Sequence, residues 1–234
     1  MQWGTVWRAL RPRPLLPESL RMAGAALLAG CVALVLAAFV AGRGNPGRLD
    51  TALDPRFQAW LGRFPALLEQ LPRLGGLKEV ALMTVALALA CVATRRWSGA
   101  VLAVVAVPGA VGLTEYVLKP YVGAVIDQAF PSGHATSSFA LATIFAILLA
   151  DPAYRRVPGA LRLLLVLMAM LAAAAVAAAM IANGAHTFTD AVGGAAVGAG
   201  VVLACALTLD LLVSRARRAP AEQSDPACSD QASR

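Results

Sequence analysis

The chain has 234 residues, of which 59% are hydrophobic and only 14% are charged, whereas soluble domains average about 45–50% apolar and about 25% charged residues. This composition excludes a soluble fold, and it also excludes a disordered chain, because disordered segments are poor in hydrophobic residues. The net charge of +7 does not indicate nucleic acid binding, because the arginines form short clusters at the ends of apolar runs, as beside membrane spans.

Six apolar runs are long enough to cross a membrane as helices, which takes about 20 residues. They predict an all-α integral membrane bundle over residues 22–213, with spans at Met22–Ala41, Leu77–Thr94, Ser98–Leu118, Ala135–Ala150, Leu163–Ala182 and Ala191–Val213. The first run is longer than the apolar region of a signal peptide and lacks a clear cleavage site, so we interpret it as a retained anchor. The third is expected to end at Lys119, because Pro120 follows.

The basic residues predict the orientation of the bundle in a cell membrane. If the N-terminus lies inside, 13 of the 20 Lys and Arg residues fall on the cytoplasmic side and the other 7 outside, as the positive-inside rule requires. Residues 1–21 and 214–234 are therefore predicted to be cytoplasmic. Their polar and Pro-rich composition further predicts that 1–20 and 214–234 are poorly ordered.

The first outer loop, Gly42–Gly76, contains a further helical pattern. Leu49, Leu53, Phe57 and Trp60 recur at helical spacing. This pattern predicts an amphipathic helix that either lies on the outer membrane surface or packs against the end of the bundle. The sequence favours neither arrangement.

Three rare polar residues are predicted to lie at the outer face, and polar groups at membrane depth indicate function. They are Lys119 and the only two histidines of the chain, His134 and His186. The segment Pro131-Ser132-Gly133-His134 precedes an apolar helix, so its backbone N–H groups could bind an anion at the helix N-terminus. An ordinary helix cap would explain the same segment. A lysine at the end of a span is most often an interface residue, although Lys119 could also hold an anion or pair with Glu115.

The second histidine is followed four residues later by an acid, Asp190. On a helix these two side chains share a face, so the carboxylate could orient the imidazole and raise its basicity. A nucleophilic or general-base histidine is commonly arranged in this way. A capping role for Asp190 is the structural alternative, since Asn183-Gly184 marks a break before the last span.

The chain carries Lys119, then Pro-Ser-Gly-His, then His-x-x-x-Asp on successive outer segments of six spans. This order of motifs resembles the type-2 phosphatidic acid phosphatase superfamily. The resemblance covers roughly Leu49–Val213 and implies a phosphatase that hydrolyses lipid phosphates or diphosphates through a phosphohistidine, without a metal or other cofactor. It implies that His186 is the nucleophile, Asp190 its orienting carboxylate and His134 the general acid. Lys119, Ser132 and Gly133 would then bind the phosphate.

Two positions depart from the family pattern. The first motif of the family ends in Arg-Pro, where this chain has Ile126-Asp127, and the third begins with Ser-Arg, where it has Ala179-Met180. Both phosphate-binding arginines are missing, and Arg–phosphate contacts are strong. Because the histidines are retained but the phosphate-binding arginines are missing, we expect turnover to occur but to be slow.

Other functions remain open at this stage. A non-catalytic relative could bind a lipid headgroup or support a partner protein. A proton-coupled transporter is disfavoured, because charged residues are missing from the middle of the spans, and a zinc enzyme is disfavoured by the lack of a ligand-spacing motif. The pattern is compatible with prenyl diphosphate, phosphatidate or phosphatidylglycerol phosphate as the substrate. It is equally compatible with a monomer and with an oligomer.

Overall fold

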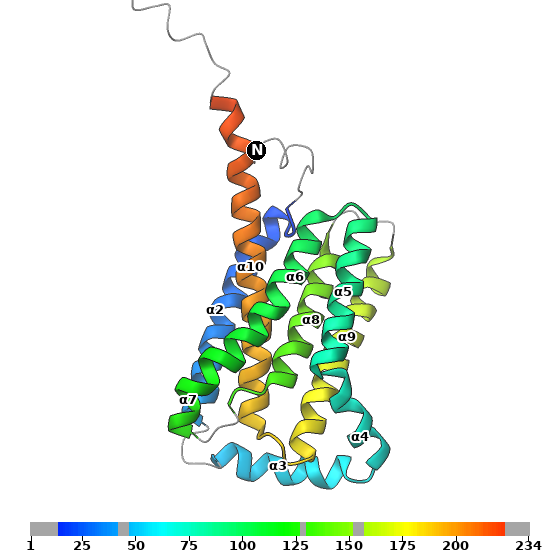
Figure 1. Ribbon diagram of the computed structural model, residues 1–234, viewed down its shortest axis with the longest axis vertical. Helices are drawn as coiled ribbons and strands as arrows, with labels where there is room; N and C mark the ends of the chain where they lie inside the picture. The colour runs from blue at the N-terminus through cyan, green and yellow to red at the C-terminus, as the bar shows by residue number, and fades with distance from the viewer. Residues whose placement is uncertain (1–13, 42–46, 127–129, 152–156, 223–234) are drawn as a thin grey trace, which may run out of the picture.

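The computed structural model describes residues 14–41, 47–126, 130–151 and 157–222. In these ranges the protein is all-α, as predicted, and the helices form an upright bundle (Figure 1). Five helices are long and apolar enough to cross a membrane. They are α2 (Glu18–Ala41), α6 (Trp97–Gly112) with its continuation to Val122, α8 (Gly133–Ala150), α9 (Gly159–Ala182) and α10 (Phe188–Glu222).

The remaining predicted span is shorter and is reached through a bend. Helix α5 (Leu77–Ala93) has 17 residues, or about 25 Å at 1.5 Å per residue. It follows α4 (Pro65–Leu74) at an angle of 54°, and this bent pair passes the same test for a span. Described helices therefore supply up to six spans, consistent with the multi-pass prediction.

Helices α8 and α10 form the centre of the bundle, and they touch because small residues line their contact. A Cβ atom on Gly198 of α10 would lie 2.2 Å from the carbonyl oxygen of Thr136 on α8. Glycine at this position lets the two backbones approach closely, as in other membrane helix pairs. The glycines of the last span therefore serve packing within the chain.

The outer loop folds into two helices at one end of the bundle, α3 (Arg48–Leu61) and α4. Helix α3 lies across that end below α9 and α10 (Figure 1). Its residues Asp50 and Leu61 are buried. Of the two arrangements that the sequence left open, the structure therefore shows the helix packed against the bundle.

The third span does not end at Lys119, contrary to the prediction. A π-helical segment, η1 (Leu113–Leu118), follows α6, and α7 (Lys119–Ile126) continues it. The amide of Lys119 donates to the carbonyl of Thr114, five residues earlier. A proline removes a donor and crowds the preceding α-helical turn, and the wider π-helical turn before Pro120 lets the helix continue.

The structure describes residues 14–20 and 214–222 of the two terminal segments predicted to be poorly ordered, and the disorder of the C-terminal tail stays a prediction. Helix α10 extends past Val213 to Glu222. Leu15 and Leu16 are buried in the hydrophobic core, and their amides donate to the Asp210 carboxylate at 2.6 and 2.9 Å. Residues 1–13 and 223–234 lie outside the described residues. The start of α2 and the end of α10 share one end of the bundle, opposite α3 and α4 (Figure 1).

Candidate active site

The Pro131-Ser132-Gly133-His134 segment forms the N-terminus of α8 and is fixed to α10. Ser132 is the N-cap, and its hydroxyl accepts a hydrogen bond from the amide of Ala135 at 3.4 Å. The Ser132 amide donates to the carbonyl of Asp190 at 3.0 Å. Gly194 permits this contact, because a Cβ there would lie 2.4 Å from the Ser132 carbonyl oxygen. The Ser132 amide is thus already used, which leaves the amides of Gly133 and His134 as the N–H groups of the first turn that could bind an anion.

His186 lies in the turn between α9 and α10, two residues before α10 begins at Phe188. Its amide donates to the carbonyl of Met180 at 3.3 Å, and its side chain is only 11% exposed. The Nδ1 atom lies 3.6 Å from Oδ2 of Asp190, which exceeds hydrogen-bonding distance. Nδ1 is buried without a hydrogen-bond partner among the described residues. The predicted pair is therefore adjacent, and a small shift of the ring would close the bond.

Asp190 also caps α10, which is the structural role that the sequence offered as an alternative for this residue. Its carboxylate accepts from the Thr187 amide at 3.0 Å, and the Thr187 hydroxyl accepts from the Asp190 amide at 3.3 Å. This reciprocal arrangement is a capping box. It fixes the Asp190 carboxylate beside His186.

Two further carboxylates, from α3, complete the cap of α10. Successive amides at the start of this helix each donate to a different acid: Thr187 to Asp190 at 3.0 Å, Phe188 to Asp54 at 3.0 Å and Thr189 to Asp50 at 2.9 Å. Burial raises the pKa of Asp54; the hydrogen bond from Phe188 opposes the rise, and the charges of Asp50 and Asp190 add to it. Negative charge is favourable at a helix N-terminus. These carboxylates occupy the α10 N-terminus, which leaves the α8 N-terminus with the amides of Gly133 and His134 that could bind an anion.

The sequence did not single out Asp50 or Asp54. Their spacing of four residues in the outer loop was the available signal, because it places two acids on one face of the predicted helix. Asp50 is 1% exposed and also accepts from the Thr189 hydroxyl at 3.0 Å. It is therefore a structural clamp between α3 and α10.

Lys119 and Glu115 form an ion pair directly over the α8 N-terminus. The Lys119 ammonium lies 2.6 and 2.8 Å from the two carboxylate oxygens of Glu115. A Cβ on Gly133 would lie 2.4 Å from Oε1 of Glu115 and 3.8 Å from Nζ of Lys119. The predicted pairing is thus present, and the carboxylate of Glu115 stands where an incoming anion would meet the α8 amides.

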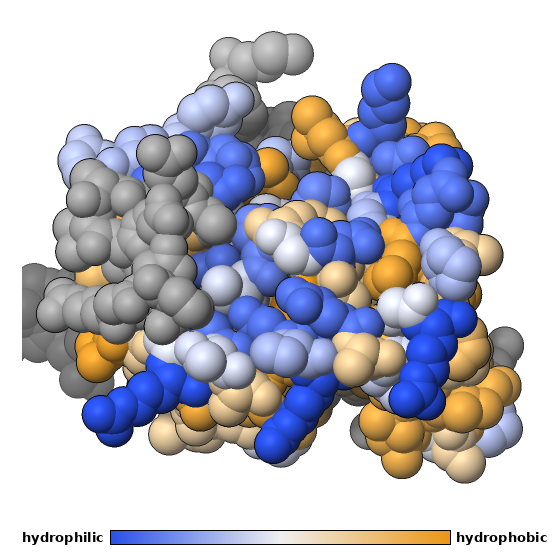
Figure 2. Space-filling model, turned by 90° about the horizontal axis from the view of Figure 1, so that it is seen from below, coloured by the Kyte–Doolittle hydropathy of each residue, from blue (hydrophilic) through white to orange (hydrophobic). Residues whose placement is uncertain are grey.

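The structure brings the three predicted segments together. His134 lies within electrostatic reach of His186, Lys119 and Glu115. Viewed from this end, hydrophilic residues gather over the middle of the bundle (Figure 2). Polar groups from η1 and α7, α8 and the α9–α10 turn therefore share one site at the end covered by α3 and α4.

The two positions that carry arginine in the family pattern differ in what the structure shows. Ala179 and Met180 are buried at the end of α9, at 0% and 7% exposure. Asp127 and the side chain of Ile126 lie outside the described residues. Within the described part of the chain, no group of three or more His, Cys, Asp or Glu side chains is arranged to hold a metal ion.

Comparison with known proteins identifies one family. The sequence model of the PAP2 superfamily matches residues 19–212, a range that includes both histidines and nearly the full length of the described spans. No curated protein and no solved structure matches the chain.

Proposed function

The chain belongs to the PAP2 superfamily, and from this premise we propose that it is a lipid phosphatase that hydrolyses a lipid phosphate or diphosphate, a prenyl diphosphate included. Family membership and the apolar helices support a phosphatase-type protein of the membrane. The observation that carries the finer proposal is the convergence of His134, His186 and Lys119 at one end of the bundle.

The proposed chemistry uses the two histidines in sequence. Because Nδ1 of His186 faces Asp190, the opposite nitrogen, Nε2, attacks phosphorus. The bond from phosphorus to the leaving oxygen breaks as His134 donates a proton to that oxygen. In the second step His134 accepts a proton from water, the water oxygen attacks the phosphohistidine, and the P–N bond breaks to release phosphate. Asp190 orients His186 and stabilises its positive charge.

Phosphate binding in this proposal depends on Lys119 and the α8 N-terminus. The amides of Gly133 and His134 and the ammonium of Lys119 would contact the phosphoryl oxygens. Ser132 contributes by holding the turn against α10, since its own amide donates to Asp190. The substrate must displace the Glu115 carboxylate from Lys119 to take this position.

The site is proposed to face the extracytoplasmic side. Helices α3 and α4, which cover the site, belong to the segment assigned to the outside by the distribution of basic residues. The start of α2 and the end of α10 share the opposite end of the bundle (Figure 1), so both termini would be cytoplasmic.

A second candidate function is headgroup binding without turnover. Three observations favour it: Ala179 and Met180 replace the family's Ser-Arg, Glu115 neutralises Lys119, and His186 stands 3.6 Å from Asp190. A protein of this kind would bind a lipid phosphate and release none of it.

Phosphate release from a panel of lipid phosphates separates the two functions. The full chain would be purified and assayed in EDTA, where turnover should persist, and with vanadate, which should block it. His186→Ala should abolish turnover, and Asp190→Asn should reduce it in part. Glu69→Gln on α4 is the matched control, because Glu69 is 67% exposed and touches none of these groups. Lipid binding with no release from any lipid would establish the second function.

A further inference from the structure

Two buried threonine hydroxyls connect the π-helical segment η1 to the start of α8. Thr114 of η1 and Thr136 of α8 are both 0% exposed. The Thr136 hydroxyl donates to the carbonyl of Ser132 at 2.9 Å, and its oxygen lies 3.2 Å from the hydroxyl oxygen of Thr114. A threonine hydroxyl has one proton, so Thr114 is the donor in the second bond. Because the Ser132 amide donates to the carbonyl of Asp190, this chain of hydrogen bonds ties η1, α8 and α10 together at the site.

The π-helical turn places Lys119 on the same face of its helix as Thr114. In an α-helix, two residues five apart differ by about 140° around the axis, since each residue turns the helix by about 100°. In η1 the Lys119 amide donates to the Thr114 carbonyl, five residues earlier. The two residues therefore occupy successive turns, one above the other. The face that contacts Thr136 on α8 is also the face that carries Lys119.

This face brings the Lys119 ammonium to the N-terminus of α8. A Cβ on Gly133 would lie 3.8 Å from Nζ of Lys119. Gly133 precedes Thr136 by three residues, or about 4.5 Å along the helix. Helix α8 begins at the end of the bundle towards which α6 and η1 run (Figure 1). The contact between the two threonines therefore lies about one helical turn deeper in the bundle than the ammonium, and it supports the ammonium from below.

We propose that Thr114 is a positioning residue for the phosphate site. Its hydrogen bond to Thr136 fixes η1 against α8 and thereby holds the Lys119 ammonium over the α8 N-terminus. Without this bond η1 can turn against α8, and the ammonium moves with it. The inference rests on the proposed function in one respect, because it takes Lys119 as a phosphate ligand. Thr114 is itself fully buried, so it acts on the phosphate through Lys119.

Phosphate binding reports the position of the ammonium without requiring turnover. The full chain in detergent micelles would be titrated with inorganic phosphate and with a non-hydrolysable phosphonate analogue of a lipid phosphate. Thr114→Val keeps the shape of the side chain and removes the hydroxyl. It should weaken the binding of both probes by roughly three- to tenfold, about the size of one hydrogen bond. Thr114→Ser restores the hydroxyl and should bind both probes within about twofold of the wild type.

A double-mutant cycle tests whether Thr114 acts through Lys119. Lys119→Met removes the ammonium and should itself weaken phosphate binding by roughly tenfold or more, as expected for a charged hydrogen bond. In that background Thr114→Val should have almost no further effect, because the two residues contribute to one contact. A hydroxyl with a merely structural role would instead change binding equally in both backgrounds.

Thr84→Val is the matched control. Thr84 is also buried, at 6% exposure, and its hydroxyl donates to the carbonyl of Val80 within its own helix, α5. This variant loses a buried hydroxyl away from the site and should leave phosphate binding unchanged. Melting temperatures show which variants fold. If Thr114→Val does not fold, Thr136→Val removes the acceptor of the same bond and should weaken binding in its place.

The outcomes separate this inference from the proposed function. Unchanged phosphate binding in Thr114→Val, or an equal loss with and without Lys119, overturns the inference, and release of phosphate by the wild type then leaves the phosphatase in place. Binding that depends on both residues, with no release from any lipid, overturns the phosphatase and supports the inference. No binding of either probe by the wild type overturns the inference, because Lys119 is then not a phosphate ligand.

Discussion

Removal of the Asp50 carboxylate should destabilise the protein more than removal of any other acid of the outer loop. In Asp50→Ala, three donors lose their acceptor: the Thr189 amide at 2.9 Å, its hydroxyl at 3.0 Å and the Gly47 amide at 3.2 Å. Each unsatisfied buried donor costs roughly 1–3 kcal/mol. The hydroxyl can rotate, and repulsion from Asp54 and Asp190 is relieved, so a net loss of about 3 kcal/mol is expected from these contributions.

Thermal unfolding of the purified protein in detergent micelles measures this loss. For a chain of this size, 1 kcal/mol corresponds to about 2–4 °C, so the melting temperature should fall by about 6–12 °C. Asp50→Asn keeps one acceptor oxygen and should lose about half as much. Because the clamp holds the start of α10 beside His186, kcat should fall more than KM rises.

The control is Glu69→Ala, which removes an exposed carboxylate of α4 whose partner, Arg73, is also exposed. Exposed ion pairs contribute about 0–1 kcal/mol, so this variant should melt within a few degrees of the wild type. If Asp50→Ala has the same melting temperature as the wild type, the clamp does not hold α10. If Asp50→Asn lowers the melting temperature as much as Asp50→Ala does, the lost hydrogen bonds are not the cause of the destabilisation.

Three other changes test the site. Glu115→Gln frees Lys119 and should lower KM for a phosphate substrate severalfold; an unchanged KM and unchanged inhibition by inorganic phosphate would show that Glu115 does not compete. The raised pKa of Asp54 means that the folded protein keeps this proton to higher pH than the unfolded chain, so stability is lost as pH rises from 3.8 through the raised value. Asp54→Asn still accepts from Phe188 and should flatten that part of the pH–stability curve, which an unaltered curve would refute. Met180→Arg restores the family's cation at a residue whose carbonyl accepts from the His186 amide; kcat/KM should rise about tenfold through a charge-assisted contact, and a loss of activity in a folded variant would place that side chain outside the site.

The sequence was informative wherever the determining physics is local. A run of apolar residues must form a helix in a bilayer, because its backbone groups have no other partners, so the spans could be located by composition. The Ser132 cap and the Thr187–Asp190 capping box each involve residues three apart, so both partners of each contact lie within a short stretch of sequence. The order of Lys119, His134 and His186 was sufficient to indicate the family.

Predictions based on local rules failed at Pro120 and in the N-terminal segment, and a distant partner explains only the second failure. Pro120 was expected to end a helix, but the π-helical turn before it accommodates the missing donor. Leu15 and Leu16 were placed in a poorly ordered segment, but the Asp210 carboxylate, 195 and 194 residues away, binds their amides. No pattern within a short window contains both partners of such a contact.

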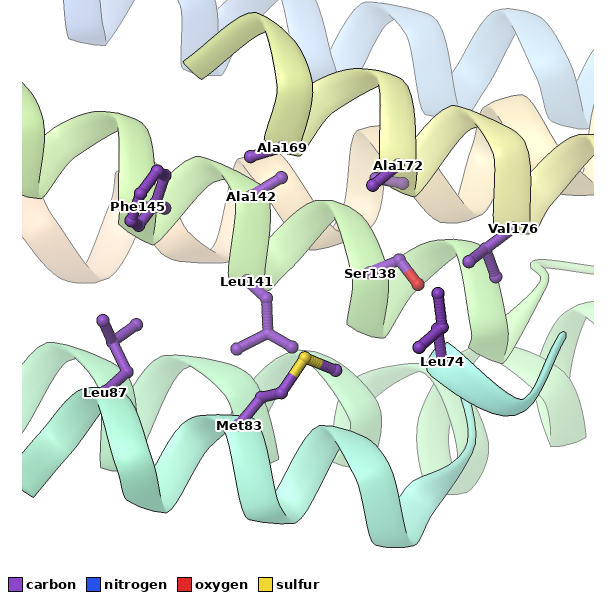
Figure 3. A pocket seen from close by; sticks show the side chains of 11 residues that line it. Leu74, Met83, Leu87, Ser138, Leu141, Ala142, Phe145, Ala169, Ala172 and Val176 are labelled. Atoms are coloured by element: carbon purple, nitrogen blue, oxygen red, sulfur yellow. The ribbon is translucent and has the colours of Figure 1, made fainter. Parts of the chain in front are cut away.

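Only the tertiary structure decided how the site is closed and what it neighbours. Asp50 reaches Thr189 across 139 residues and Asp54 reaches Phe188 across 134, so the loop helix became part of the α10 cap. An apolar groove along α8 forms only when α5, α8 and α9 come together (Figure 3). Hydrophobicity and capping depend on near neighbours in the chain, whereas the surroundings of a buried carboxylate or hydroxyl depend on which helices pack against it.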